Sequence, residues 1–249
     1  MNPFLQATLI AIAYGAVLFG IIKLFGVSYT EITKNTNNIK KGIFLPIGIG
    51  SIILTIVSAF YGWLTPVFTP PTGFTTWWMW AIPLAIMVGI IIRFRTAKWH
   101  LFTRAGIWYL VVGALFVGFS EELLTRGILV HALSQPYIPQ YLVMLVSSIL
   151  FGLLHGMNYF NGQDRKTTIT QIIITTLIGM SLYVSYIVSG TLWVPIALHA
   201  LFDISLLAQG NAPADTSRKA SSPELLTTLV FYAGTVVAFI VILVNNLAA

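Results

Sequence analysis

Long apolar runs dominate the chain, and short polar segments separate them. A run of about 20 apolar residues is long enough to cross a bilayer as a helix. By this criterion the sequence predicts eight spans, at residues 5–25, 43–64, 77–92, 105–130, 139–157, 168–188, 192–208 and 225–247. Breaks that contain Pro66, Pro136 and Gly190 separate several of them. We therefore expect an all-α, polytopic membrane protein, with residues 1–249 forming a single membrane domain.

Basic residues recur in alternate connections between these runs. Twelve of the 13 Lys and Arg residues lie in the odd-numbered connections. They fall in the first (Lys23, Lys34, Lys40, Lys41), third (Arg93, Arg95, Lys98, Arg104), fifth (Arg165, Lys166) and seventh (Arg218, Lys219). Positively charged loops of membrane proteins stay in the cytoplasm. The pattern therefore predicts that these four connections are cytoplasmic and that both termini lie on the outer side.

Composition agrees with this class. Hydrophobic residues make up 57% of the chain and charged residues 8%, which excludes an ordinary soluble domain. The net charge of +6 follows from the cytoplasmic connections, so we expect the lipid bilayer and no nucleic acid as a partner. The chain contains no cysteine, which excludes disulfides and a cysteine nucleophile. The first run lacks the basic flank of a cleaved signal peptide, so we expect the mature protein to retain it. We expect the protein to lie in a bacterial cell membrane.

Two adjacent carboxylates and a guanidinium lie inside the fourth run, at Glu121, Glu122 and Arg126. Charged groups at membrane depth are costly and usually serve a function. On a helix Glu122 and Arg126 share one face, which predicts an ion pair, whereas Glu121 projects about 100° away. We therefore expect Glu121 to face a cavity as the reactive carboxylate. The alternative is a purely structural charge cluster that holds helices together.

Two further runs carry polar residues at helical spacing. Phe151 and His155 share a face in the fifth run, and His199 and Asp203 share a face in the seventh. A lone membrane histidine often only hydrogen-bonds a neighbouring helix. Together with Glu121, these groups predict one convergent polar site. Counted at 1.5 Å per residue, however, Glu121 and His155 each lie about 24 Å from opposite membrane faces, so untilted helices would separate them.

Three motifs thus occur in order on three runs: Glu121-Glu122-xxx-Arg126, Phe151-xxx-His155 and His199-xxx-Asp203. They resemble the motifs of the CAAX-protease and bacteriocin-processing (CPBP, Abi-like) family of intramembrane endopeptidases, which includes the Ras-converting enzyme. The resemblance covers residues 105–208. It implies an eight-helix fold and glutamate-dependent hydrolysis of a membrane-associated peptide or protein. Substrates of such enzymes range from prenylated CAAX proteins to peptide pheromones and bacteriocins.

The resemblance also implies roles for individual residues. The catalytic positions are Glu121, His155, His199 and Asp203, and the supporting positions are Glu122, Arg126 and Phe151. Glu121 and His155 would activate the attacking water, and His199 would stabilise the oxyanion. The family prototype has asparagine at the position of Asp203, and an ionised aspartate cannot donate a hydrogen bond. We therefore expect Asp203 to orient and charge His199 instead.

Other interpretations stay open at this level. Glu121, His155 and His199 also form a familiar set of zinc ligands, but the helical HExxH spacing is absent, and we expect no cofactor. A non-catalytic scaffold or bacteriocin-immunity protein would keep the fold without cleavage. Buried acids and histidines also build proton relays in transporters, although the sequence shows no inverted repeat.

Overall fold

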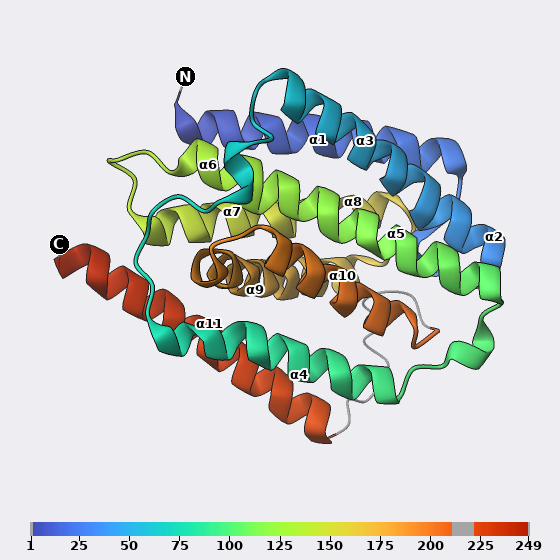
Figure 1. Cartoon of the computed structure of the whole chain (residues 1–249). Coiled ribbons are helices and arrows are strands. Elements are labelled where there is room, and N and C mark those ends of the chain that lie inside the picture. Colours follow the sequence, from blue (N-terminus) through green and yellow to red (C-terminus); the bar gives the residue numbers. More distant parts are fainter. Residues whose placement is uncertain (1, 211–221, 249) are drawn as a thin grey trace.

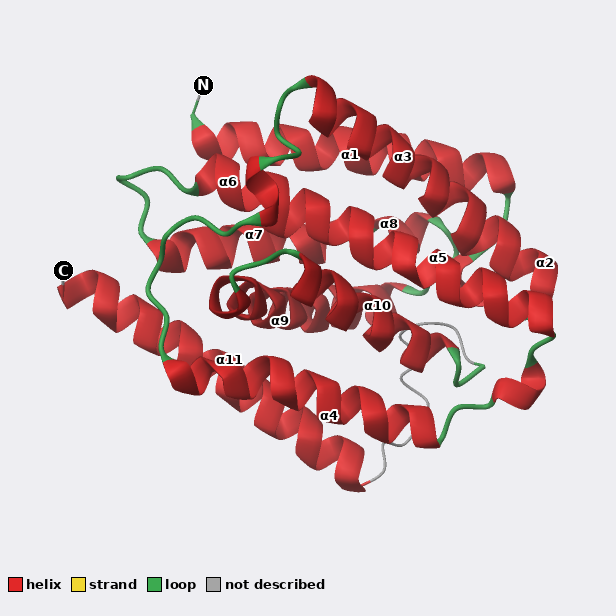
Figure 2. Ribbon diagram, in the orientation of Figure 1, coloured by secondary structure: helices red, strands yellow, loops and turns green. Residues whose placement is uncertain are grey.

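The computed structural model describes residues 2–210 and 222–248, and every regular element in those ranges is helical (Figure 2). The predicted all-α class is confirmed. Six helical stretches of the described chain are long and apolar enough to cross a membrane. They are Pro3–Phe25, Thr36–Phe60, Trp77–Arg95, Arg104–Leu133, Gln140–Phe160 and Arg165–Ser189. The protein is therefore an integral, multi-pass membrane protein.

The eight predicted spans are only partly recovered. The seventh corresponds to α10 (Trp193–Leu207), whose 15 residues are fewer than a perpendicular span needs. The eighth falls on α11 (Ser222–Ala248), of which Tyr232–Ala248 counts as a shorter apolar helix. Arg218 and Lys219, the basic pair of the predicted seventh connection, lie outside the described residues. By length and composition, the described residues thus give six candidate spans.

Most predicted breaks do end helices. The remaining long helices are α1 (Pro3–Phe25), α3 (Leu45–Phe60), α4 (Ala81–Arg95), α5 (Arg104–Glu122), α7 (Gln140–Leu154) and α9 (Arg165–Ser189). Shorter elements are η1 (Tyr29–Glu31), α2 (Thr36–Ile39), η2 (Lys40–Phe44), η3 (Pro66–Phe68), η4 (Trp77–Trp80), η5 (Trp99–Leu101), η6 (Leu123–Leu129), α6 (Val130–Leu133) and α8 (Met157–Phe160). Gly190 closes α9 in a left-handed conformation with φ of 70°, which glycine adopts without strain.

The helix α10 lies inside the bundle, between α5 and α4, and also contacts α9 (Figure 1). Its two ends are tied to connections at opposite ends of α4. The backbone N–H of Leu192 donates to Phe68 O over 3.0 Å, and the N–H of Lys98 donates to Ala208 O over 2.7 Å. This central helix therefore carries His199 and Asp203 into the middle of the molecule.

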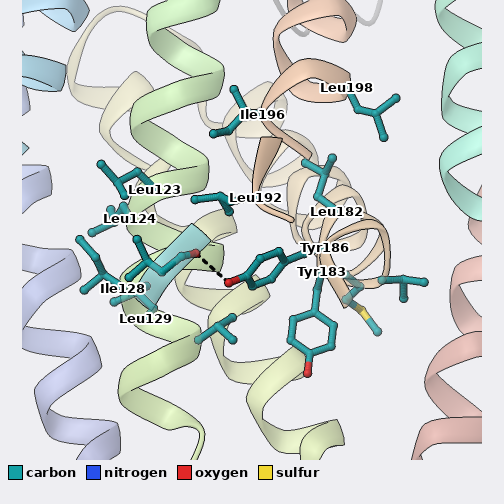
Figure 3. Packing of buried hydrophobic residues seen from close by; sticks show 14 of the residues in the cluster. Leu123, Leu124, Ile128, Leu129, Leu182, Tyr183, Tyr186, Leu192, Ile196 and Leu198 are labelled. Atoms are coloured by element: carbon teal, nitrogen blue, oxygen red, sulfur yellow. Dashed lines mark hydrogen bonds between the residues drawn. The ribbon is translucent and has the colours of Figure 1, made fainter. Parts of the chain in front are cut away.

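A buried tyrosine anchors the connection that follows α3. The hydroxyl of Tyr186, on α9, donates to the carbonyl oxygen of Val67 over 2.7 Å (Figure 3). Both residues are buried, and Leu129 and Leu192 are fully buried nearby in the same apolar cluster. A hydrogen bond inside an apolar cluster satisfies groups that have no access to water. The connection is thereby held against α9 and η6.

The contact between α5 and α10 depends on a glycine. A Cβ atom added at Gly118 would lie 2.9 Å from both the backbone nitrogen of Ala200 and the carbonyl oxygen of Ile196. Those atoms belong to the α10 backbone and cannot rotate away. The absent side chain therefore lets α5 approach α10 directly, one turn before the two glutamates.

We predict that Gly118→Ala will destabilise the protein by about 1–3 kcal/mol, because the two helices must move apart. Gly20→Ala is the matched control, since Gly20 is an exposed glycine within α1 and its added Cβ meets no atom within 4 Å. That control should be neutral or slightly stabilising. Thermal unfolding of both variants in detergent measures the difference. Equal melting temperatures would contradict the close contact.

Candidate active site

The four predicted catalytic residues line one cavity. Glu121, His155, His199 and Asp203 all contribute to the wall of a cavity of about 540 Å³. Glu121 comes from the last turn of α5, His155 directly follows α7, and the other two lie on α10. Most of the remaining wall is apolar. The depth difference expected between Glu121 and His155 does not prevent them from sharing this cavity.

Glu122 contacts Arg126 and His199 behind this wall. Its Oε1 accepts a hydrogen bond of 2.9 Å from Arg126 Nη1 and lies 2.7 Å from Nδ1 of His199. The predicted Glu122–Arg126 ion pair is therefore present, and both side chains are at most 1% exposed. Two donors on one oxygen offset much of the cost of burying the carboxylate. The contact with His199 was not predicted, because the two residues lie 77 positions apart.

Arg126 extends this network to two more helices. Its Nη2 donates to the carbonyl oxygen of Gly179 on α9 over 3.0 Å, and its guanidinium lies 4.5 Å from the ring centre of Phe151 on α7. A Cβ atom at Gly179 would come within 3.2 Å of that nitrogen, so glycine leaves room for the approach. A cation over an aromatic face is stabilised further when it is desolvated. One guanidinium thus holds η6, α7 and α9 together.

His199 is oriented by Glu122 and presents its other nitrogen to two carboxylates. With Nδ1 on Glu122, Nε2 lies 3.8 Å from Glu121 Oε2 and 3.7 Å from Asp203 Oδ2. We expected Asp203 to orient this ring, but the shorter, hydrogen-bonding contact comes from Glu122. Asp203 is 23% exposed and Glu121 20%, so both acids retain access to the cavity.

Phe151 packs against both histidines. Its ring packs edge-on against His155, with centroids 5.1 Å apart, and against His199 at 5.7 Å. His155 Nδ1 lies 3.1 Å from the carbonyl oxygen of Phe151, which leaves Nε2 for a partner in the cavity. The predicted supporting residue therefore contacts both imidazoles.

The comparison with protein families agrees with these positions. Residues 103–205 match the family described as type II CAAX prenyl endopeptidase Rce1-like. This part of the chain is similar to that family. The resemblance read from the three motifs is thereby confirmed, and the match includes every predicted catalytic and supporting residue. No curated protein and no solved structure matches the chain.

The Rce1-like segment departs from regular helix at its most charged point. The α-helix ends at Glu122, and η6 continues as seven residues of π-helix that include Arg126. Our angular argument assumed an uninterrupted α-helix, so it missed this change. π-helical turns are rare and often occur at functional sites. Every residue of η6 is buried, which shows that packing stabilises this less common geometry.

The zinc alternative gains no support from the Rce1-like site. Within the described ranges, no group of three or more His, Asp or Glu side chains has an arrangement that could hold a metal ion. His155 and His199 both pack against the ring of Phe151. The absence of a cofactor stays a prediction.

We predict that Glu122→Gln will lower stability by about 3–5 kcal/mol, because the substitution leaves the buried Arg126 without its counter-charge. The matched control is Glu31→Gln, which removes an exposed ion pair with Lys34 at 2.8 Å. Exposed pairs contribute little to stability, so this control should unfold close to the parent. Chemical denaturation in detergent compares the two. A Glu122→Gln protein as stable as the control would refute the network.

Proposed function

We propose that this protein is an intramembrane endopeptidase that cleaves a membrane-associated peptide or protein, with Glu121 as the general base. The observation that most directly supports this proposal is the unequal environment of the two adjacent glutamates. Glu122 is paired with Arg126 and His199 through Oε1 and is fully buried, whereas Glu121 lines the cavity, is 20% exposed and has its Oε2 3.8 Å from His199 Nε2. The description of the matched family as an endopeptidase supports the same reaction class.

The proposed reaction uses water as the nucleophile. Glu121, assisted by His155, takes a proton from a water molecule as its oxygen attacks the scissile carbonyl carbon. The protonated Nε2 of His199 donates to the oxyanion that forms. When the C–N bond breaks, the proton held by Glu121 passes to the leaving amine. Asp203, 3.7 Å from Nε2, favours the cationic form of His199 by Coulomb attraction.

Glu121→Gln is expected to abolish cleavage while leaving the fold intact. Loss of a general base lowers kcat by about 10²–10⁴-fold, and the substitution leaves the Glu122–Arg126 pair in place. Cleavage of quenched fluorescent peptides and thermal unfolding are measured for the same preparations, with and without a chelator. We expect no effect of the chelator on the parent. Substantial activity in the Glu121→Gln protein would refute the assignment of the base.

We further propose that the chain crosses the membrane eight times with both termini outside. The ends of α10 support a crossing despite its length, because Leu192 bonds to Phe68 and Ala208 to Lys98, on connections at opposite ends of α4. At 1.5 Å per residue a helix of this length covers about 22 Å, which flanking segments and local bilayer thinning extend. The alternating basic connections support the orientation.

Reporter fusions test this topology. Fusions after Pro70 and Gly190 should report the outer side, and fusions after Lys41, Lys98 and Lys166 should report the cytoplasm. Paired reporters that are active on opposite sides of the membrane serve as mutual controls at each position. If α10 did not cross, a fusion in the connection after it would report the same side as the fusion after Gly190.

A further inference from the structure

The cavity has a second polar region, formed by three neutral side chains. Tyr29 lies in η1, Asn158 in α8 and Gln171 in the second turn of α9, and all three line the same cavity as Glu121. The general base and the histidines lie on other elements. The proposed hydrolysis does not use these three side chains.

These three side chains form a directional chain of hydrogen bonds. Asn158 Nδ2 donates to Gln171 Oε1 over 3.0 Å, and Gln171 Nε2 donates to the hydroxyl of Tyr29 over 2.9 Å. A tyrosine hydroxyl can accept and donate at once. In the described ranges no acceptor takes the proton of Tyr29, so its O–H remains available as a donor. Bonds in such a chain polarise one another and strengthen the last donor.

The backbone holds Tyr29 in position. Its N–H donates to the carbonyl oxygen of Asn161 over 2.8 Å, and the Ser28 hydroxyl donates to the same oxygen over 3.1 Å. Asn161 Nδ2 in turn donates to the carbonyl oxygen of Val27 over 3.2 Å. The connection after α1 is therefore clamped to the connection before α9, and the tyrosine ring enters the cavity from a fixed support.

We propose that Tyr29 positions the substrate by donating a hydrogen bond to a backbone carbonyl oxygen of the bound peptide. This inference rests on the proposed peptidase function, because it assigns the group that aligns the peptide relative to Glu121. An extended peptide carries carbonyl oxygens that need donors once they leave water. Most of the cavity wall is apolar, and the Asn158–Gln171–Tyr29 chain ends in a donor that its own hydrogen bonds orient.

The electrostatic surroundings favour a neutral carbonyl over a terminal carboxylate. Burial raises the pKa of Tyr29, and the negative charges of Asp203 and Glu121 raise it further, so the hydroxyl stays protonated at neutral pH. The same two charges repel an anion placed at the hydroxyl. Tyr29 is thus a neutral donor near two acidic side chains. This environment favours a neutral peptide carbonyl as its acceptor over a carboxylate.

Binding to an inactive protein separates this inference from catalysis. The probe is a fluorescein-labelled decapeptide of Leu and Ala with an amidated C-terminus, added to the Glu121→Gln protein in detergent. Tyr29→Phe in that background should weaken binding about 2- to 12-fold, the range expected for one hydrogen bond. Tyr159→Phe, at a neighbouring exposed tyrosine, is the control and should leave the dissociation constant unchanged.

A double variant distinguishes positioning from a structural role. Tyr29→Phe alone strands the amide of Gln171, which is 8% exposed, so it should also lower the melting temperature. Adding Gln171→Leu removes the stranded amide; it also removes the acceptor of Asn158 Nδ2, but Asn158 is only partly buried, so stability should be largely restored. Under the proposal, peptide binding stays weak in the double variant. If binding recovers together with stability, Tyr29 only holds the connection and the proposal is wrong.

The remaining outcomes are also decisive. A Tyr29 effect that appears only with a free C-terminal carboxylate would overturn the carbonyl assignment. Failure of the decapeptide to bind the Glu121→Gln protein would overturn the inference as well. If Tyr29→Phe weakens binding but the parent cleaves no peptide, the proposed peptidase function fails while the peptide-binding role of Tyr29 stands.

Discussion

The structure depends on one buried carboxylate, that of Glu122. It binds Arg126 and His199 through the same oxygen, and Arg126 then reaches Gly179 and Phe151. Four segments, η6, α7, α9 and α10, are thereby tied to the end of α5. Inside a membrane protein such a network is stable only when each charge has a partner, because unpaired ions are expensive to bury. The relative positions of these helices follow from that requirement.

This arrangement separates a supporting acid from a reactive one. Two neighbouring glutamates would repel each other in a cavity, but Glu122 is neutralised by its partners and Glu121 is left to face the open space. Arg126, which pairs with Glu122, lies in the π-helix that follows it directly. Tyr29 lines the same cavity and offers a neutral donor, so the proposed acid–base chemistry and peptide alignment use different elements.

Local patterns predicted much of this site. Apolar runs predicted the helices, and spacing of three or four residues predicted the Glu122–Arg126 pair, because helical neighbours are determined by the backbone geometry alone. The ordered motifs indicated the family. The inability of an ionised aspartate to donate a hydrogen bond led us to expect Asp203 as the partner that orients His199. Local patterns could not reveal the contact between Glu122 and His199, whose distance depends on how α5 packs against α10.

The sequence by itself therefore determined the membrane class, the helical elements, the residues of the charged site and one local ion pair. Only the tertiary structure decided that Glu121, His155, His199 and Asp203 share a cavity and that Gly118 allows close packing of α5 and α10. It also placed Tyr29 in the wall of that cavity, hydrogen-bonded to Gln171. The physical reason is the range of the interactions. Hydrophobicity and i, i+4 contacts act along one segment, whereas a cavity and its hydrogen-bond partners arise from side chains of separate helices that packing brings together.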